Sequence, residues 1–185
     1  MAHRVCPWWL GYLLASPMRR LMQDPVKVLA PYLREGMTVL EPGPGMGFFT
    51  LELARLVGPS GRVVAIDIQP RMLSRLKRRA ARARLLGRVD ARMAAPDSLG
   101  IQDLARAVDF TLAFALVHEL PAVEPFFAEV AMASKHGAGL LFAEPTGHVK
   151  PADFEAELAA ANHAGFKLLR RPEIRRSLAA FALRE

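Results

Sequence analysis

The chain has 185 residues, of which 52% are hydrophobic, and a formal net charge of +7. This length suits one domain with a sizeable core, and no stretch reaches the roughly 18–20 apolar residues of a membrane-spanning helix. The single cysteine, Cys6, excludes an internal disulfide, and no clear signal-peptide cleavage site follows the start, so we expect a cytoplasmic protein.

Residues 1–36 form a leader in which we expect one or two short helices, broken at Pro17, Pro25 and Pro31. Its aromatic residues are candidate substrate contacts: Trp8, Trp9 and Tyr12. Three interpretations stay open, namely a lid that offers an aromatic wall to a substrate, an apolar anchor onto the core, and a helix at a membrane surface.

From about residue 37 the pattern alternates between strand and helix. The expected strands cover residues 37–41, 62–68, 89–93, 109–114, 138–144, 166–171 and 178–183, and the expected helices cover 48–57, 70–86, 123–134 and 151–164. Such alternation predicts an α/β domain over residues 37–185, with a mostly parallel sheet covered by helices on both faces.

A glycine-rich turn joins the first expected strand to the first expected helix. Its residues run Glu41-Pro42-Gly43-Pro44-Gly45-Met46-Gly47. Glycines allow a close backbone approach to a ligand, and the following helix favours negative groups at its N-terminus. Phe48 stands where the dinucleotide fingerprint needs a third glycine, whereas Asp67, 20 residues after Gly47, ends the second strand and can accept hydrogen bonds from ribose hydroxyls.

These two features, together with the stretch DFTLAFALVHELP at residues 109–121, resemble the class I methyltransferases that depend on S-adenosylmethionine (SAM), and most of all their small type 11 branch. The resemblance covers about residues 37–143. It implies a Rossmann-like, doubly wound sheet of seven strands in the order 3-2-1-4-5-7-6, with SAM as cofactor and S-adenosylhomocysteine as product.

The resemblance also implies a role for each matching position. Glu41 would contact the methionine ammonium, and Gly43, Pro44, Gly45 and Gly47 would form the turn beneath methionine and ribose. Asp67 would hold the ribose hydroxyls. The residues implied around adenine are Ile68, Met72, Asp97 and Ser98, and those at the methionine end are Phe114 and Ala115. Asp97 and Ser98 are equally well explained as a helix N-cap.

His118 is the candidate general base, because it follows the fourth strand at the edge where the methyl group is expected and its unperturbed pKa of about 6.5 suits proton transfer. The resembling family commonly has a second His next to it, and this chain has Glu119 there, which is the second catalytic candidate. A purely structural His118 is the alternative. Glu144 and His148 follow the fifth strand and are candidate substrate contacts; a metal bound by His118, Glu144 and His148 is not expected.

Residues 71–92 hold nine Lys and Arg against one acid, Asp90, so this segment carries +8 and the rest of the chain about −1. We expect a solvated helix face, with an anionic partner such as nucleic acid as the alternative.

The sequence therefore predicts a methyltransferase for a small molecule. The alternatives are an RNA or protein methyltransferase that uses the basic helix, and a SAM-binding protein without catalysis.

Overall fold

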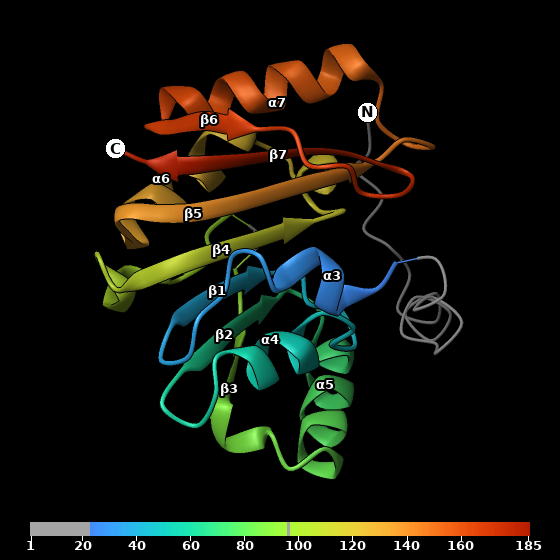
Figure 1. The fold of residues 1–185 in the computed structure, drawn as a ribbon, viewed down its shortest axis with the longest axis vertical. Coiled ribbons are helices and arrows are strands. Elements are labelled where there is room, and N and C mark those ends of the chain that lie inside the picture. Colours follow the sequence, from blue (N-terminus) through green and yellow to red (C-terminus); the bar gives the residue numbers. More distant parts are fainter. Residues whose placement is uncertain (1–22, 96) are drawn as a thin grey trace. The chain divides into compact units, whose positions relative to one another are not determined.

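The computed structural model describes residues 23–95 and 97–185, which fall into two compact units, one before and one after residue 96. The leader residues Trp8, Trp9 and Tyr12 lie outside the described residues. The two units are described in turn (Figure 1).

The N-terminal unit is built on three parallel strands in the order β3-β2-β1. Its elements are α3 (Pro25–Leu29), β1 (Thr38–Pro42), α4 (Thr50–Leu56), β2 (Arg62–Asp67), α5 (Pro70–Arg82), η1 (Leu86–Arg88) and β3 (Val89–Met93). The central strand β2 is buried along nearly its whole length, as the unbroken apolar run of its sequence predicts for a parallel strand covered on both faces.

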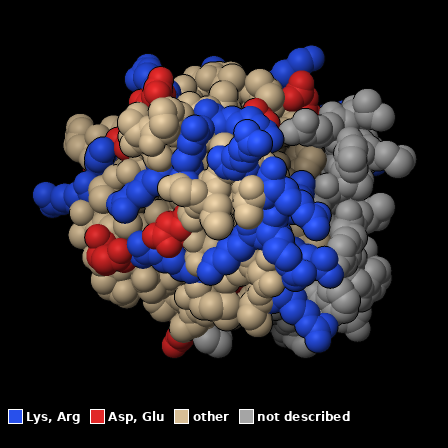
Figure 2. Space-filling model, turned by 90° about the horizontal axis from the view of Figure 1, so that it is seen from below, with Lys and Arg blue, Asp and Glu red and all other residues tan. Residues whose placement is uncertain are grey.

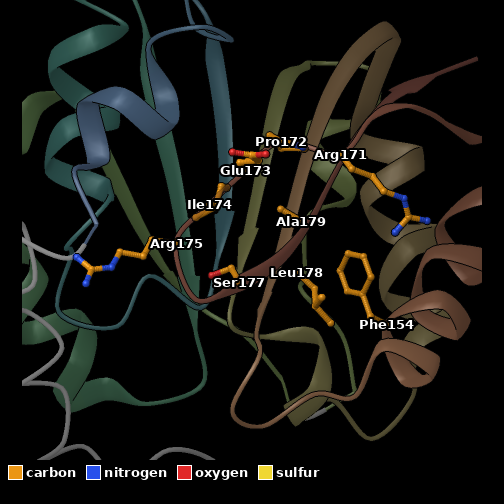
Figure 3. Close-up of a pocket in the computed structure, with 9 residues that line it drawn as sticks. All are labelled: Phe154, Arg171, Pro172, Glu173, Ile174, Arg175, Ser177, Leu178 and Ala179. Atoms are coloured by element: carbon orange, nitrogen blue, oxygen red, sulfur yellow. The ribbon is translucent and has the colours of Figure 1, made fainter.

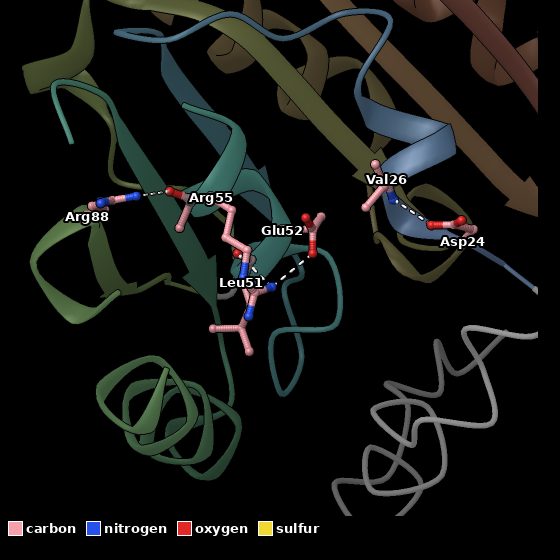
Figure 4. Close-up of polar contacts among 7 residues, drawn as sticks. Asp24, Val26, Leu51, Glu52, Arg55 and Arg88 are labelled. Carbon is pink, nitrogen blue, oxygen red and sulfur yellow. Dashed lines mark hydrogen bonds and ion pairs between the residues drawn. The ribbon is translucent and has the colours of Figure 1, made fainter. Parts of the chain in front are cut away.

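Side chains fix the short elements of this unit (Figure 4). Asp24 caps α3 by accepting a hydrogen bond from the backbone N–H of Val26 at 3.0 Å. Arg88, in η1, donates to the carbonyl of Ala54 in α4 at 3.1 Å. The loop before β3 is thereby tied to the helix that follows the glycine-rich turn.

Helix α5 ends at Arg82, four residues before the predicted end at 86. Arg84 takes a left-handed conformation, with φ of 57°, and Leu85 N–H bonds back to the Ala80 carbonyl at 2.8 Å. This closure leaves Leu85 buried. The prediction ended the helix just before Gly87, because glycine usually supplies the left-handed residue that follows a helix. Here Arg84 supplies that residue.

The C-terminal unit has four strands in the order β4-β5-β7-β6, of which β4 and β5 are parallel and the other two pairs antiparallel. Its elements are η2 (Gln102–Leu104), β4 (Val108–Phe114), η3 (Val117–Glu119), α6 (Val123–Ala133), β5 (Ser134–Pro145), α7 (Pro151–His163), β6 (Phe166–Arg170) and β7 (Ser177–Arg184). Strand β5 begins before the predicted residue 138 because Ser134 already pairs with Val108.

Helix α7 lies along β6 and β7 and packs against α6 (Figure 1). Phenylalanines fix this packing. Phe142 of β5 stacks on Phe154 of α7, with ring centroids 4.8 Å apart, and meets Phe127 of α6 edge-on at 5.8 Å. All three rings are buried. The strand orders of the two units, β3-β2-β1 and β4-β5-β7-β6, together make up the predicted order 3-2-1-4-5-7-6. The predicted Rossmann-like fold class is confirmed.

Candidate functional site

The glycine-rich turn of the N-terminal unit uses its glycines for different reasons. All three have left-handed backbone angles, with φ of 68°, 55° and 82° at Gly43, Gly45 and Gly47. A side chain at Gly45 would meet no atom of the described residues within 4 Å, so none of them fills the space beside this part of the turn. A side chain at Gly47 would instead collide with Leu76 of α5. Gly47 is therefore needed for packing as well as for its backbone conformation.

Helix α5 holds the same turn through a cation. The Arg79 guanidinium donates to the carbonyl of Met46 at 2.5 Å. Within the turn, Gly47 N–H donates to the carbonyl of Pro44 at 2.9 Å. Pro44 itself is buried. The turn is therefore fixed from inside and from α5, and sequence reasoning did not single out Arg79 or Leu76.

Glu41, in β1 just before the turn, is a buried acid whose Oε2 has no hydrogen-bond partner among the described residues. Burial raises the pKa of Glu41 to about 8; the Thr50 side chain partly offsets the rise, and the nearby charge of Asp67 adds to it. An acid in such a place is costly to ionise unless a cation or donor meets it. The position therefore suits the carboxylate partner of a ligand ammonium.

Asp67 ends β2 and is 8% exposed. Its Oδ1 accepts a hydrogen bond from Gln69 N–H at 2.8 Å, which fixes the carboxylate at the carboxyl end of the strand. The next residue, Ile68, is 44% exposed, whereas Met72 is buried on the inner face of α5. Of the two predicted adenine neighbours, Ile68 is thus the accessible one.

Asp97 and Ser98 open the C-terminal unit, and their surroundings differ. The Asp97 side chain is exposed. Ser98 Oγ donates to Glu129 of α6 at 3.1 Å and accepts from Gly100 N–H. Ser98 is thus engaged within its own loop, and of this pair Asp97 is the more accessible to a ligand.

Strand β4 ends at the predicted pair Phe114 and Ala115, and Phe114 is half-buried. Ala115 has φ of 55°, and its N–H donates to the Ala143 carbonyl of β5 at 2.7 Å. A left-handed conformation costs a non-glycine residue about 1–3 kcal/mol, and such residues gather at functional sites. This strained turn directs the chain into η3, which carries His118.

His118 and Glu144 form the main polar contact of the C-terminal unit. Glu144 Oε2 bonds to His118 Nδ1, while Glu144 Oε1 accepts from the N–H groups of Val117 at 2.7 Å and Leu116 at 3.2 Å. Glu144 is fully buried, and the His118 side chain is 23% exposed. The hydrogen bond from Glu144 raises the pKa of His118 above its ordinary value.

This arrangement assigns the tautomer of His118. Because the Glu144 carboxylate accepts a hydrogen bond from Nδ1–H, Nε2 of the neutral ring is left as the acceptor. From its place after the fifth expected strand, we expected Glu144 to contact substrate. In the structure it is buried and orients the histidine.

His148 and Glu119 lie beside this pair. The exposed His148 ring stacks nearly parallel to His118, with centroids 6.1 Å apart and 13° between planes. The half-buried Glu119 is a further negative charge that raises the pKa of His118. No group of three or more His, Cys, Asp or Glu in residues 23–95 and 97–185 is arranged to hold a metal ion.

Glu157 of α7 is a further buried acid near His118 and Glu144 that sequence reasoning missed. It is 8% exposed, and its Oε2 has no hydrogen-bond partner in the described part of the chain. Burial raises its pKa to about 7, and the charge of Glu144 adds to the rise. The available signal was its place on the helix face that also carries Phe154, Leu158 and Ala161, all apolar and buried.

A groove of about 600 Å³ lies in the same unit, between α7 and the segment that leads into β7. Its lining is Phe154, Arg171, Pro172, Glu173, Ile174, Arg175, Ser177, Leu178 and Ala179. Figure 3 shows Phe154 and Leu178 close together and the two arginines pointing in opposite directions. Leu178 is paired with Glu144 across β5 and β7, so both side chains leave the sheet on the same face.

Comparisons with known proteins identify the family and agree with the fold. A family model described as a methyltransferase domain matches residues 33–175. The crystal structure of a SAM-dependent methyltransferase from Aquifex aeolicus is 26% identical, with a TM-score of 0.85 over 97% of this chain and 99% of that chain.

Two curated relatives match shorter segments, and both are protein-L-isoaspartate O-methyltransferases. The one from Methanothrix thermoacetophila is 46% identical over 52 residues, which are 28% of this chain and 25% of that protein. The one from Triticum aestivum is 33% identical over 67 residues, 36% of this chain and 29% of that protein. The chain thus matches only a quarter to three tenths of the length of these relatives.

In the described part of the chain, no helix is both long and apolar enough to cross a membrane.

The match over residues 33–175, a large majority of the chain, settles the family. The chain belongs to the class I methyltransferases, whose cofactor is S-adenosylmethionine.

Proposed function

We propose that the chain transfers the methyl group of SAM to a small-molecule acceptor and releases S-adenosylhomocysteine. SAM, when bound, supplies a methyl group already activated by the positive sulfonium. The chain must then hold the donor, orient the acceptor, exclude water and remove a proton where the acceptor carries one. The observation that carries this proposal is the His118–Glu144 pair.

Residues of the N-terminal unit fit the cofactor. The unpartnered oxygen of Glu41 suits the methionine ammonium, the open backbone at Gly45 suits close approach of the ligand, and Asp67 suits the ribose hydroxyls. The other proposed donor contacts in this unit are Gly43, Pro44, Gly47, Ile68 and Met72, and those proposed in the C-terminal unit are Asp97, Ser98, Phe114 and Ala115.

His118 is proposed as the general base. Glu144 holds Nδ1–H, so Nε2 accepts the proton that an acceptor hydroxyl or ammonium loses, and Glu144 stabilises the resulting imidazolium. Two backbone N–H groups hold Glu144 in turn, which fixes the ring orientation. A base of this kind contributes about 10²–10⁴ in rate.

The groove beside Phe154 and Leu178 is proposed to receive the acceptor. Leu178 shares a face of the sheet with Glu144, the residue that orients the base. Its lining combines apolar side chains such as Phe154 and Leu178 with the charged side chains of Arg171, Glu173 and Arg175. This lining suits a small molecule with an apolar body.

A protein carboxylate is the second candidate acceptor, favoured by the two partial matches to isoaspartate methyltransferases. The two candidates make different demands on His118. A carboxylate has already lost its proton at pH 7, so methylation of it needs no general base. Substitution of His118 by Ala should therefore slow transfer to a hydroxyl or amine by about 10²–10⁴ and largely spare transfer to a carboxylate.

The first test is titration calorimetry with SAM and S-adenosylhomocysteine on the wild type, on Asp67→Ala and on Asp90→Ala as a matched control. Asp90 lies on β3 and pairs with Arg92 at the surface. We expect at least tenfold weaker binding in Asp67→Ala, equivalent to about 1.4 kcal/mol, and no change in the control.

Once donor binding is established, formation of S-adenosylhomocysteine is followed with hydroxyl and amine small molecules, an isoaspartyl peptide and RNA. Turnover with a small molecule that disappears in His118→Ala supports the proposal. Turnover with the peptide alone favours the second candidate, and donor binding without turnover on any acceptor points to a SAM-binding protein. Absence of SAM binding to the wild type refutes the proposal.

A further inference from the structure

The outer face of α5 carries a run of exposed cations. Arg71, Arg75, Arg78 and Arg82 are spaced by four, three and four residues, which places them on one side of the helix, and all four are exposed. They extend over about 16 Å at 1.5 Å per residue. We call these four residues the basic stripe, and Lys77 and Arg84 are exposed beside it.

No acid lies next to the basic stripe in the sequence. Residues 68–89 contain eight Lys and Arg and no Asp or Glu. Of the nearest acids on either side, Asp67 is buried and Asp90 pairs with Arg92 at 2.7 Å. Figure 2 shows Lys and Arg side chains gathered in a band across the face seen from below. The segment that carries the stripe therefore has a net charge of +8, which favours an anionic partner.

The chemistry of the stripe selects among anionic partners. A membrane-surface helix inserts apolar side chains, but the large apolar residues of α5, which are Met72, Leu73 and Leu76, are all buried in the unit. The stripe itself consists only of arginines, whose planar guanidinium groups bond phosphate oxygens in pairs and also stack on bases. A nucleic acid therefore fits better than a run of carboxylates, because only a nucleic acid offers bases for stacking, and better than a lipid surface, because α5 has no large apolar side chain free to insert.

We propose that the basic stripe of α5 binds the phosphate backbone of RNA. This surface is separate from the donor contacts, and the proposal does not depend on the identity of the methyl acceptor. Its position has one consequence for the chemistry. The same helix holds the glycine-rich turn through Arg79 and Leu76, so RNA on the outer face and a ligand at the turn both act on α5.

The test is fluorescence anisotropy of a labelled 20-nucleotide poly(U) RNA with the full chain over a range of salt concentrations. Four phosphate contacts predict a slope of about −2.8 in log K against log salt, which is roughly a 50-fold loss between 50 and 200 mM. Charge reversal at Arg75, Arg78 and Arg82 to Glu should weaken binding at least tenfold at 50 mM salt.

The matched control reverses three exposed cations elsewhere in the same unit, Lys27, Arg34 and Arg62, also to Glu. It changes the net charge by the same amount, and binding should fall less than threefold. Melting temperatures verify that both variants fold. If either does not, the corresponding Gln variants replace both.

Parallel titrations use poly-L-glutamate and vesicles of phosphatidylserine and phosphatidylcholine. Preference for RNA by at least tenfold over poly-L-glutamate, without vesicle binding, supports the proposal. Equal losses in the two triple variants, binding that salt leaves unchanged, equal affinity for poly-L-glutamate, or binding to vesicles in place of RNA would each overturn it.

Discussion

Each unit buries a glutamate at the end of a strand, and the two are treated in opposite ways. Glu144 in β5 has its oxygens bonded to two backbone N–H groups and to His118. Glu41 in β1 is equally inaccessible, yet its Oε2 has no partner among the described residues and burial raises its pKa to about 8. A buried acid whose oxygens are hydrogen-bonded can position a neighbouring side chain. A buried acid with an unbonded oxygen lowers the stability of the fold, and a ligand that bonds to it removes this loss.

Glu144→Gln provides the largest test of this contrast. A glutamine amide can donate to Nδ1, which would place the ring proton on Nε2 and remove the acceptor, so we expect kcat/KM to fall by about 10²–10⁴. Loss of the carboxylate should also lower the pKa of His118, because its hydrogen bond is the main cause of the rise. Histidine NMR titration measures this shift without any substrate.

The pH dependence gives the sign of the same effect. The base is active when His118 is neutral, so wild-type kcat/KM should rise with pH through a midpoint above 6.5. In Glu144→Gln the midpoint should move down and the plateau should fall. His148→Gln is the control, because it alters the stacked ring and leaves Glu144 in place. An unchanged His118 pKa in Glu144→Gln would contradict the proposed pairing.

Glu41→Gln tests the unsatisfied acid through stability and binding together. An unfolded Glu titrates near 4.5 and the folded one near 8, so the folded protein loses stability as pH rises between these values. The variant should match the wild type at pH 4.5 and melt at a higher temperature at pH 8, since each pKa unit corresponds to about 1.4 kcal/mol.

The same variant should bind SAM at least tenfold more weakly in calorimetry, because the ammonium loses its carboxylate. Glu35→Gln, at an exposed glutamate of the same unit, serves as the control for a lost charge. A Glu41→Gln protein that is less stable at pH 8 and binds SAM normally would show that Glu41 is structural.

Glu157→Gln tests whether the contrast extends to α7. Burial raises the pKa of Glu157 to about 7, so its cost to stability appears as pH rises from about 4.5 to 7. We expect the variant to be more stable than the wild type at pH 8, by less than Glu41→Gln because the rise is smaller. It should also lower the pKa of His118 slightly, since Glu157 is a weaker contributor there. Thermal melts at pH 4.5 and pH 8 measure the first effect.

Sequence patterns predicted the parts of the molecule that follow from local rules. The alternation of strand and helix gave the fold class, and the glycine turn with Asp67 marked one candidate ligand site. The end of α5 was wrong by four residues because Arg84 adopts a conformation usually left to glycine. Such a choice depends on the burial of Leu85, which a local pattern does not contain.

The C-terminal cluster depended on tertiary structure in the same way. His118 and Glu144 were both candidates, but 26 residues separate them, and only the pairing of β4 with β5 brings them together. Glu157 was missed because helix patterns assign acids to the solvent side. It faces the core beside Phe154, whose stacking on Phe142 fixes α7 against the sheet.

Of these substitutions, Glu155→Gln should have the smallest effect on the free energy of unfolding. Glu155 and Arg171 form a two-pronged ion pair at 2.7 and 2.8 Å, but about half of each side chain is exposed. Solvent screens such pairs, which typically contribute about 0.2–1 kcal/mol. Denaturant unfolding at pH 7 should therefore differ from the wild type by less than 1 kcal/mol, with the exposed Glu173→Gln as control. A loss above 2 kcal/mol would mean that the pair fixes α7 to the segment before β7. The burial of an acid would then no longer predict how much it contributes to stability in this unit.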